Sequence, residues 1–144
     1  TRMNPDPTVI VWGHSPPWCS AISRQLNQFR LSWVLNYESL WAEALKIDAS
    51  AVVIEIPNKS LDSLTTNLAQ LDNNPFQIKT FTVGKLPNSL WERELRMLGN
   101  CGHYESAADI PLLEIAVQRH HQHRIRSETS VEQNVWANLP WPTP

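Results

Sequence analysis

Short apolar, β-branched runs alternate along the chain with longer segments in which apolar residues recur every three or four positions. The first pattern is typical of buried strands and the second of amphipathic helices. The predicted strands are Thr8–Trp12, Leu31–Leu35, Ala51–Ile56, a strand within Phe76–Val83 and a short fifth strand around His103–Tyr104. Strands that alternate with helices in this way predict βα units and a parallel sheet.

Residues that favour helix starts, such as Ser15 before a Pro-Pro pair, precede the helical segments. The predicted helices are Ser15–Arg30, Glu38–Ile47, a segment from Ser60 or Asp62 to Leu71, a segment from Asn88 or Ser89 to Leu98, and a segment from Ile110 to Arg124 or Arg126. With right-handed crossovers, this order predicts an α/β fold, a three-layer αβα sandwich around a five-stranded parallel sheet of order 2-1-3-4-5.

The apolar stripes of the helices predict which side chains face the sheet. The predicted inward residues are Leu40, Trp41, Ala44 and Leu45 in the second helix, Leu90, Trp91, Leu95 and Leu98 in the fourth, and Leu112, Leu113, Ala116, Val117 and His120 in the last. Burial of these stripes on both faces of the sheet would supply the core.

The chain has 144 residues and a formal net charge of -2. This length suits one domain with its own core, and the charge does not favour nucleic acid or an acidic membrane surface as a partner. No apolar run approaches the roughly 20 residues that span a bilayer, and Thr1–Thr8 lacks the apolar core of a signal peptide. Two distant cysteines, Cys19 and Cys101, make no disulfide framework, so a cytoplasmic, reducing location is expected.

We predict a domain over residues 1–126 and a C-terminal tail over residues 127–144 that contains tryptophan and proline. Exposed aromatic side chains cost solubility. We therefore expect Trp136 and Trp141 to dock, either on this domain or on a partner.

Four places in the chain carry a family resemblance. TVIVW is followed by a helix that begins with Ser-Pro; ESLWAEAL leads to AVVIEI and a proline; ELRMLGNCGHY joins the fourth helix to the fifth strand; and DIPLLEIAV opens the last helix. Over roughly Thr8 to Arg124, this order resembles the receiver domain of two-component response regulators. The resemblance implies a flavodoxin-like fold and a role in signal transduction.

In that family an acidic pair after the first strand holds Mg²⁺, an Asp that ends the third strand accepts the phosphoryl group, a Thr or Ser ends the fourth strand, and a Lys follows the fifth. Here Gly13 and His14 follow the first strand, Glu55 takes the acceptor position, Thr82 is the candidate hydroxyl, and residues 106–108 contain no Lys. The resemblance thus implies a degenerate receiver, or pseudo-receiver, with no metal and no cofactor.

Two interpretations of this degenerate site stay open. Glu55 is either a built-in mimic of a phosphorylated Asp or an ordinary polar residue at a strand end. His14, Glu55 and Thr82 are also expected to line one crevice at the carboxyl ends of the strands, where α/β proteins bind ligands. A histidine, a carboxylate and a hydroxyl in one crevice could perform acid–base chemistry.

Two other groups of residues are candidate sites. His120, His121 and His123 lie near the end of the last helix, where they suit a solvated terminus better than a zinc site that lacks further ligands. Cys19 lies in a first helical turn, where a thiolate is favoured, but a half-buried structural cysteine is the preferred interpretation.

We therefore expect a non-catalytic signalling or regulatory domain that binds a protein partner, a second copy of the chain being one candidate. Receivers commonly signal through the face made by the fourth helix, fifth strand and fifth helix, which here would include Trp91 and Tyr104. The alternative is a domain that binds or converts a small molecule in the crevice at His14, Glu55 and Thr82. A DNA-associated regulator is a third hypothesis, disfavoured by the overall charge.

Overall fold

The computed structural model describes residues 8–47, 49–57, 61–73 and 78–123. The elements are β1 (Thr8–Trp12), α1 (Pro16–Gln25), β2 (Arg30–Val34), α2 (Tyr37–Lys46), β3 (Ala49–Glu55), α3 (Asp62–Asp72), β4 (Lys79–Val83), α4 (Ser89–Met97), β5 (Asn100–Tyr104) and a short 3-10 turn, η1 (Ala107–Asp109). A last helix follows over residues 110–123. The predicted boundary at residue 126 and the tail lie outside the described residues.

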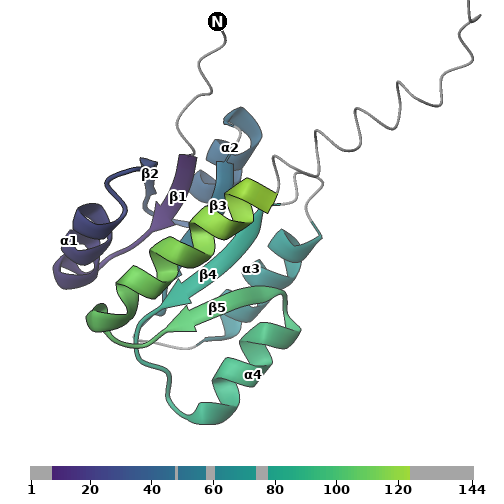
Figure 1. Cartoon of the computed structure of the whole chain (residues 1–144). Helices are drawn as coiled ribbons and strands as arrows, with labels where there is room; N and C mark the ends of the chain where they lie inside the picture. Colours follow the sequence, from purple (N-terminus) through teal and green to yellow (C-terminus); the bar gives the residue numbers. More distant parts are fainter. Residues whose placement is uncertain (1–7, 48, 58–60, 74–77, 124–144) are drawn as a thin grey trace, which may run out of the picture.

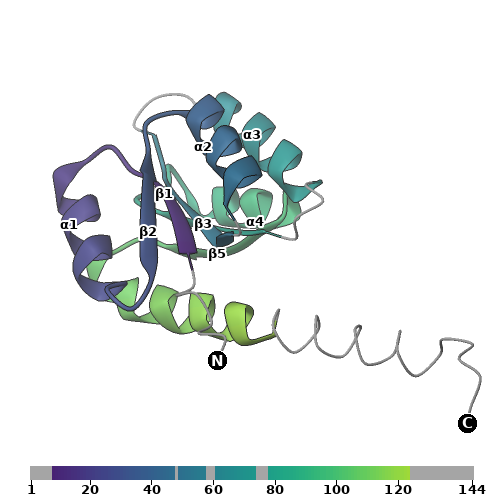
Figure 2. The ribbon, with the colours of Figure 1, turned by 90° about the horizontal axis from the view of Figure 1, so that it is seen from above.

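The five strands form one parallel sheet in the order β2-β1-β3-β4-β5, so the predicted fold class and strand order are confirmed (Figure 1). Seen from above, the sheet separates two helical layers (Figure 2). The last helix and α1 cover one face, and α2, α3 and α4 cover the other. Within the described residues, no helix combines the length and the apolar character that a bilayer crossing requires.

Each face of the sheet carries its own core because successive strand residues point to opposite faces. Ile10, Val52 and Ile54 belong to the core beneath α2, α3 and α4. Val11 and Val53 belong to the core beneath α1 and the last helix. Every residue of β3 is buried, which explains why this central strand reads as an almost continuous apolar run.

Three side chains that were predicted to face the sheet are exposed instead: Leu45 at 59%, Leu90 at 70% and Leu112 at 57%. Each one is next in sequence to a residue that does pack inward, and neighbouring helical residues are rotated by about 100°. A helix on a sheet buries only a narrow arc, so the predicted stripes were too wide. Leu40 and Leu95 fit the prediction and are fully buried.

The helix starts differ in how their free backbone N–H groups are bound. Asn36 caps α2 by accepting a hydrogen bond from the Ser39 N–H at 2.8 Å. Asn88 caps α4 through the Leu90 N–H at 3.0 Å. Ser15, the residue before α1, makes no side-chain cap. The backbone N–H groups of His14 and Ser15, which come just before the helix, are bound by Glu55 at the end of β3.

Candidate functional site

Glu55, the last residue of β3, binds the loop between β1 and α1. Its Oε1 accepts hydrogen bonds from the backbone N–H of His14 at 3.1 Å and of Ser15 at 3.0 Å. Free N–H groups at the start of a helix form a region of partial positive charge that stabilises a carboxylate. Glu55 thus ties the loop before α1 to the end of β3, through N–H groups that precede the helix and not through those of its first turn.

The other oxygen of the same carboxylate meets the imidazole of His14. Glu55 Oε2 lies 3.0 Å from His14 Nδ1, and His14 Nε2 lies 3.3 Å from the carbonyl oxygen of Ile56. Both ring nitrogens therefore face oxygen acceptors, so whichever nitrogen carries a proton has an acceptor within reach. The Glu55 side chain is only 4% exposed, so these partners compensate a buried charge.

Gly13 and Cys19 pack beside this carboxylate. A Cβ atom on Gly13 would lie 2.9 Å from Cys19 Sγ and 3.6 Å from Glu55 Oε1, so the site leaves room only for glycine unless a neighbour shifts. Burial, and then the nearby negative charge of Glu55, raise the pKa of the Cys19 thiol. The protonated thiol is favoured, in line with the interpretation of Cys19 as a structural residue.

Thr82 does not share a crevice with His14 and Glu55, which corrects the sequence-based expectation. In the sheet register Thr82 is level with Ile54, and Glu55 is level with Val83. Side chains at the same level point to the same face, so Thr82 points toward the α3 and α4 layer while Glu55 points toward α1. The three residues do not assemble an acid–base site.

The residues level with Glu55 on β4 and β5 are Val83 and Tyr104. Val83 is fully buried, and the half-buried Tyr104 packs against the same core beneath α1 and the last helix. Burial raises the pKa of the Tyr104 hydroxyl. Across these three strands the row contains one carboxylate, one aliphatic side chain and one phenol, with neither an aliphatic hydroxyl nor a lysine.

A second polar cluster, which sequence reasoning missed, lies where β4 meets β5. The Thr82 hydroxyl oxygen accepts from Asn100 Nδ2 at 2.9 Å and lies 2.8 Å from His103 Nδ1. Burial lowers the pKa of His103, partly offset by Glu92 and by the backbone of Gly84. Asn100 Oδ1 and His103 Nε2 find no hydrogen-bond partner among the residues that the structure describes.

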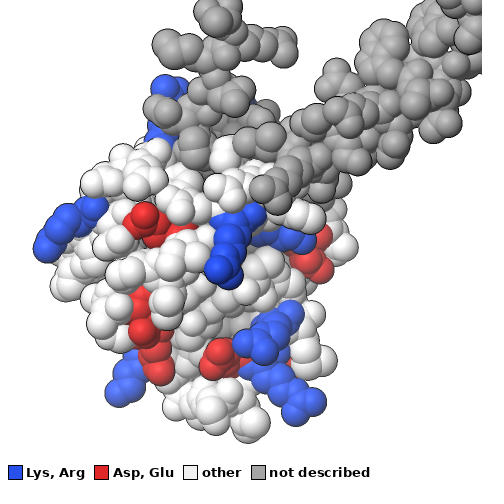
Figure 3. Space-filling model, in the orientation of Figure 1, with Lys and Arg blue, Asp and Glu red and all other residues white. Residues whose placement is uncertain are grey.

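The predicted interaction surface is only partly described. Trp91 is half-buried against the core, and Trp136 and Trp141 lie outside the described residues. Exposed apolar side chains lie on α4 and on the last helix: Leu90, Met97, Leu112 and Ile115. Figure 3 shows basic and acidic side chains side by side over α4, and further charged side chains of both signs scattered over the rest of this face.

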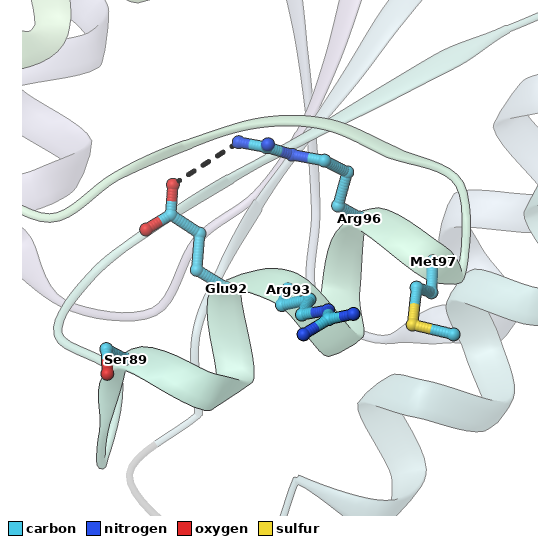
Figure 4. Close-up of a pocket in the computed structure, with 5 residues that line it drawn as sticks. All are labelled: Ser89, Glu92, Arg93, Arg96 and Met97. Carbon is cyan, nitrogen blue, oxygen red and sulfur yellow. Dashed lines mark ion pairs between the residues drawn. The ribbon is translucent and has the colours of Figure 1, made fainter.

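A shallow hollow lies along the outer side of α4 (Figure 4). Its lining residues are Ser89, Glu92, Arg93, Arg96 and Met97. An ion pair of 3.6 Å joins Glu92 to Arg96 one turn apart, and Arg93 and Met97 project beside it. Such an exposed pair contributes little stability, so these charges are free to face a partner.

The histidines of the last helix do not form a metal site in the described part of the chain. His121 Nδ1 lies 2.6 Å from the hydroxyl of Ser50 and thereby links this helix to the start of β3. Over the same part, no three metal-ligating side chains come together. Cys19 and Cys101 are both free thiols.

Comparisons with known proteins give structural matches only. No family model matches the chain, and no curated protein matches its sequence. The receiver domain of the TMAO respiratory system response regulator TorR aligns with a TM-score of 0.69 and 9% identity, over 81% of this chain and 98% of that one. A response regulator from Thermotoga maritima gives a TM-score of 0.68 at 13% identity, over 79% and 96%.

A CheY-like protein (tadZ) from Pseudomonas aeruginosa PAO1 aligns with a TM-score of 0.65 at 12% identity, over 77% of this chain and 98% of that one. These matches cover nearly whole receiver domains with the strand order and helical layers described above. The chain has the flavodoxin-like fold of the response-regulator receiver domains.

Proposed function

We propose that this chain is a receiver-like signalling or regulatory domain that acts by binding a protein partner and is neither phosphorylated nor catalytic. The observation that carries this proposal is the pairing of Glu55 with His14 and with the backbone at the start of α1. These internal contacts of Glu55 occupy the region in which active receivers hold a metal ion and an acceptor carboxylate.

The donor set at this position argues against Mg²⁺. Magnesium requires a nearly octahedral set of hard oxygen ligands and usually keeps several waters. The two oxygens of Glu55 are already bound by two N–H groups and by an imidazole, and Gly13 offers no side-chain ligand. A cation here would have to displace N–H donors and an imidazole that itself carries positive charge when protonated.

The neighbouring strands argue against phosphoryl transfer in the same way. Phosphoryl transfer relies on cations and hydrogen-bond donors that offset the charge on the transferred group. Val83 and Tyr104 occupy the levels beside Glu55 on the next two strands. Thr82, the candidate hydroxyl, is bound to Asn100 on the opposite face of the sheet.

The surface of α4, β5 and the last helix suits a protein partner. Met97 is 74% exposed and Leu112 is 57% exposed, although both are apolar. Protein interfaces combine apolar anchors at their centre with charged residues at the rim, and Arg93 and Arg96 supply such charges here. The proposed partner therefore binds over this face.

A phosphorylation assay tests the first half of the proposal. The chain is incubated with Mg²⁺ and acetyl phosphate, and its intact mass and melting temperature are measured beside a receiver domain that is known to be phosphorylated. We expect no added phosphoryl group and no change in melting temperature. A stoichiometric phosphoryl adduct would contradict the proposal, and mapping it would identify a live acceptor.

An affinity pull-down with surface variants tests the second half. We expect Met97→Glu combined with Leu112→Glu to lose the partner that the wild-type chain retains. Leu35→Glu is the matched control, because Leu35 is 87% exposed after the opposite edge strand, β2. Equal loss in the control, or retention of the partner by the double variant, would place the interaction elsewhere.

A further inference from the structure

We propose that residues 135–144, VWANLPWPTP, bind intramolecularly in the groove between α2 and α3 that is lined by Tyr37 and Trp41. This segment lies outside the described residues. The inference does not depend on the proposed signalling role, because it concerns a different surface of the domain.

The groove has the size and the aromatic wall of a peptide site. Its volume is about 590 Å³, and Tyr37, Glu38, Trp41, Gln70 and Asn73 line it. The rings of Tyr37 and Trp41 are stacked, with centroids 6.4 Å apart and planes at 29°. Both rings pack against the core beneath α2, which supports them from below and leaves the other side of each ring toward the groove.

An exposed apolar stripe continues from the groove along α2. Leu45 follows Trp41 by four positions, as Trp41 follows Tyr37, so the three side chains lie on one side of the helix. Leu45 is 59% exposed although the sequence pattern predicts it to be buried. Contiguous apolar surface of this kind marks an interaction site more often than a free surface.

The chemistry of residues 135–144 complements this groove. The segment contains Trp136, Leu139 and Trp141 among three prolines. Proline-rich segments favour the polyproline II conformation, whose exposed carbonyl groups and proline rings dock in aromatic grooves at low entropic cost.

The rim of the groove offers partners for the polar groups of such a segment. The Gln70 amide can donate to a backbone carbonyl, and the Glu38 carboxylate can accept from an indole N–H. The Tyr37 hydroxyl adds a donor that stays protonated, since burial raises its pKa. One groove therefore provides aromatic surface, a donor and an acceptor.

The chain is long enough to reach this site. The last helix lies on the opposite face of the sheet from α2 and α3 (Figure 2), and His121 meets Ser50 at the edge where the strands begin. Trp141 lies 18 residues beyond His123, a span of roughly 60 Å if extended and about 27 Å if helical. A tethered segment has an effective concentration in the millimolar range, so a modest intrinsic affinity suffices.

The test compares ¹H–¹⁵N spectra of the full chain and of the variant Trp136→Ala/Trp141→Ala. We expect amide shift changes concentrated in residues 37–45 and 70–73. The control Asn134→Ala/Asn138→Ala changes one residue in the segment and one just before it without removing the aromatic rings, and it should leave those resonances in place. The molecular mass in solution is measured at two protein concentrations for each sample.

A peptide of residues 131–144 provides a second readout. We expect it to bind the Trp136→Ala/Trp141→Ala chain at 1:1 and to shift the same amides, and to bind the wild-type chain at least about tenfold more weakly because the groove is already filled. Shift changes elsewhere, or none, would overturn the proposal. Concentration-dependent shifts with a doubled mass would also overturn it, since the segment would then bind a second copy.

Discussion

The carboxylate of Glu55 is paired with His14 at two points, through the imidazole at 3.0 Å and through the backbone N–H at 3.1 Å. A third bond, from the Ser15 N–H at 3.0 Å, ties the same carboxylate to the start of α1. The end of β3 is thus fixed to the loop after β1 by one buried side chain. This arrangement makes the site a structural clamp, and it predicts that Glu55 contributes strongly to stability.

We expect Glu55→Ala to lower the free energy of unfolding by about 2 kcal/mol, because two backbone N–H groups and one imidazole lose a charged acceptor. Glu55→Gln should cost about 1 kcal/mol, because an amide oxygen can still accept from the two N–H groups but no longer pairs with His14. Urea unfolding at neutral pH measures both changes.

The exposed Glu94 on α4 provides the control for this pair of variants. Glu94→Ala should change the free energy of unfolding by no more than about 0.5 kcal/mol. If Glu55→Ala lowered the free energy of unfolding no more than Glu94→Ala does, the contacts of Glu55 would not contribute to stability. The interpretation of the site as a structural clamp would then fail.

Replacement of Gly13 by a larger residue is predicted to lower the stability of the fold moderately. A Cβ atom would lie 2.9 Å from Cys19 Sγ, so Gly13→Ala should destabilise the chain by about 1–3 kcal/mol through overpacking. Thermal or urea unfolding measures this cost. In a Cys19→Ala background the sulfur is gone, and the cost of Gly13→Ala should shrink.

The exposed Ser20 tests whether this coupling is specific. Ser20→Ala lies on the same helix and should combine additively with Gly13→Ala, as independent sites do. Additive behaviour of Gly13→Ala with Cys19→Ala would show that the contact does not limit this position.

The sequence predicts the sheet well because its central strands are buried on both faces. The apolar run Ala51–Ile56 stands out for this reason, and the structure places β3 at Ala49–Glu55. Glu55 ends β3, and its partner His14 follows the end of β1, whose last residue Trp12 is level with Ile54. Neighbouring parallel strands bring such residues to one edge of the sheet.

Other features depend on information that no local pattern holds. The alternation of Thr82 with Val83 shows that they point to opposite faces, but only the register between β3 and β4 decides which one is level with Glu55. His103 lies in β5, whose sequence NCGHY has no apolar run, so its buried contact with Thr82 left no signal.

His103 gives the chain a pH-dependent stability with a definite sign. Burial lowers its pKa below the value in the unfolded chain, which is about 6.5. The unfolded state then takes up a proton at a higher pH than the folded state, so stability is complete above about pH 6.5 and falls as the pH drops toward the folded pKa. Other groups titrate too, so the contribution of His103 must be isolated.

The variant His103→Gln isolates this contribution. Melting temperatures of the wild type and of His103→Gln are measured between about pH 7.5 and about pH 5.5. We expect the wild type to lose more stability over this interval than the variant does. If the melting temperatures of the two proteins fell in parallel with pH, His103 would have the same pKa in the folded and unfolded chain. Burial would then not lower the pKa of His103, and the prediction would be wrong.

The last prediction concerns the thiol of Cys19, whose pKa is raised first by burial and then by the charge of Glu55. Only the thiolate reacts with alkylating agents. In a Cys101→Ser background, which leaves one thiol, we expect slow reaction with iodoacetamide near neutral pH. Glu55→Gln removes the negative charge, so the midpoint of the rate-against-pH curve should move to lower pH.

The plateau rate, reached when the thiol is fully ionised, separates electrostatics from loosening of the fold. Loss of the Glu55 charge alone would lower the midpoint and leave the plateau in place, whereas local opening would expose the sulfur and raise the plateau as well. Glu94→Gln, which removes a carboxylate from the exposed surface of α4, should alter neither quantity. A midpoint unchanged by Glu55→Gln would show that the carboxylate is neutralised by His14 and the backbone so completely that its charge does not reach the sulfur.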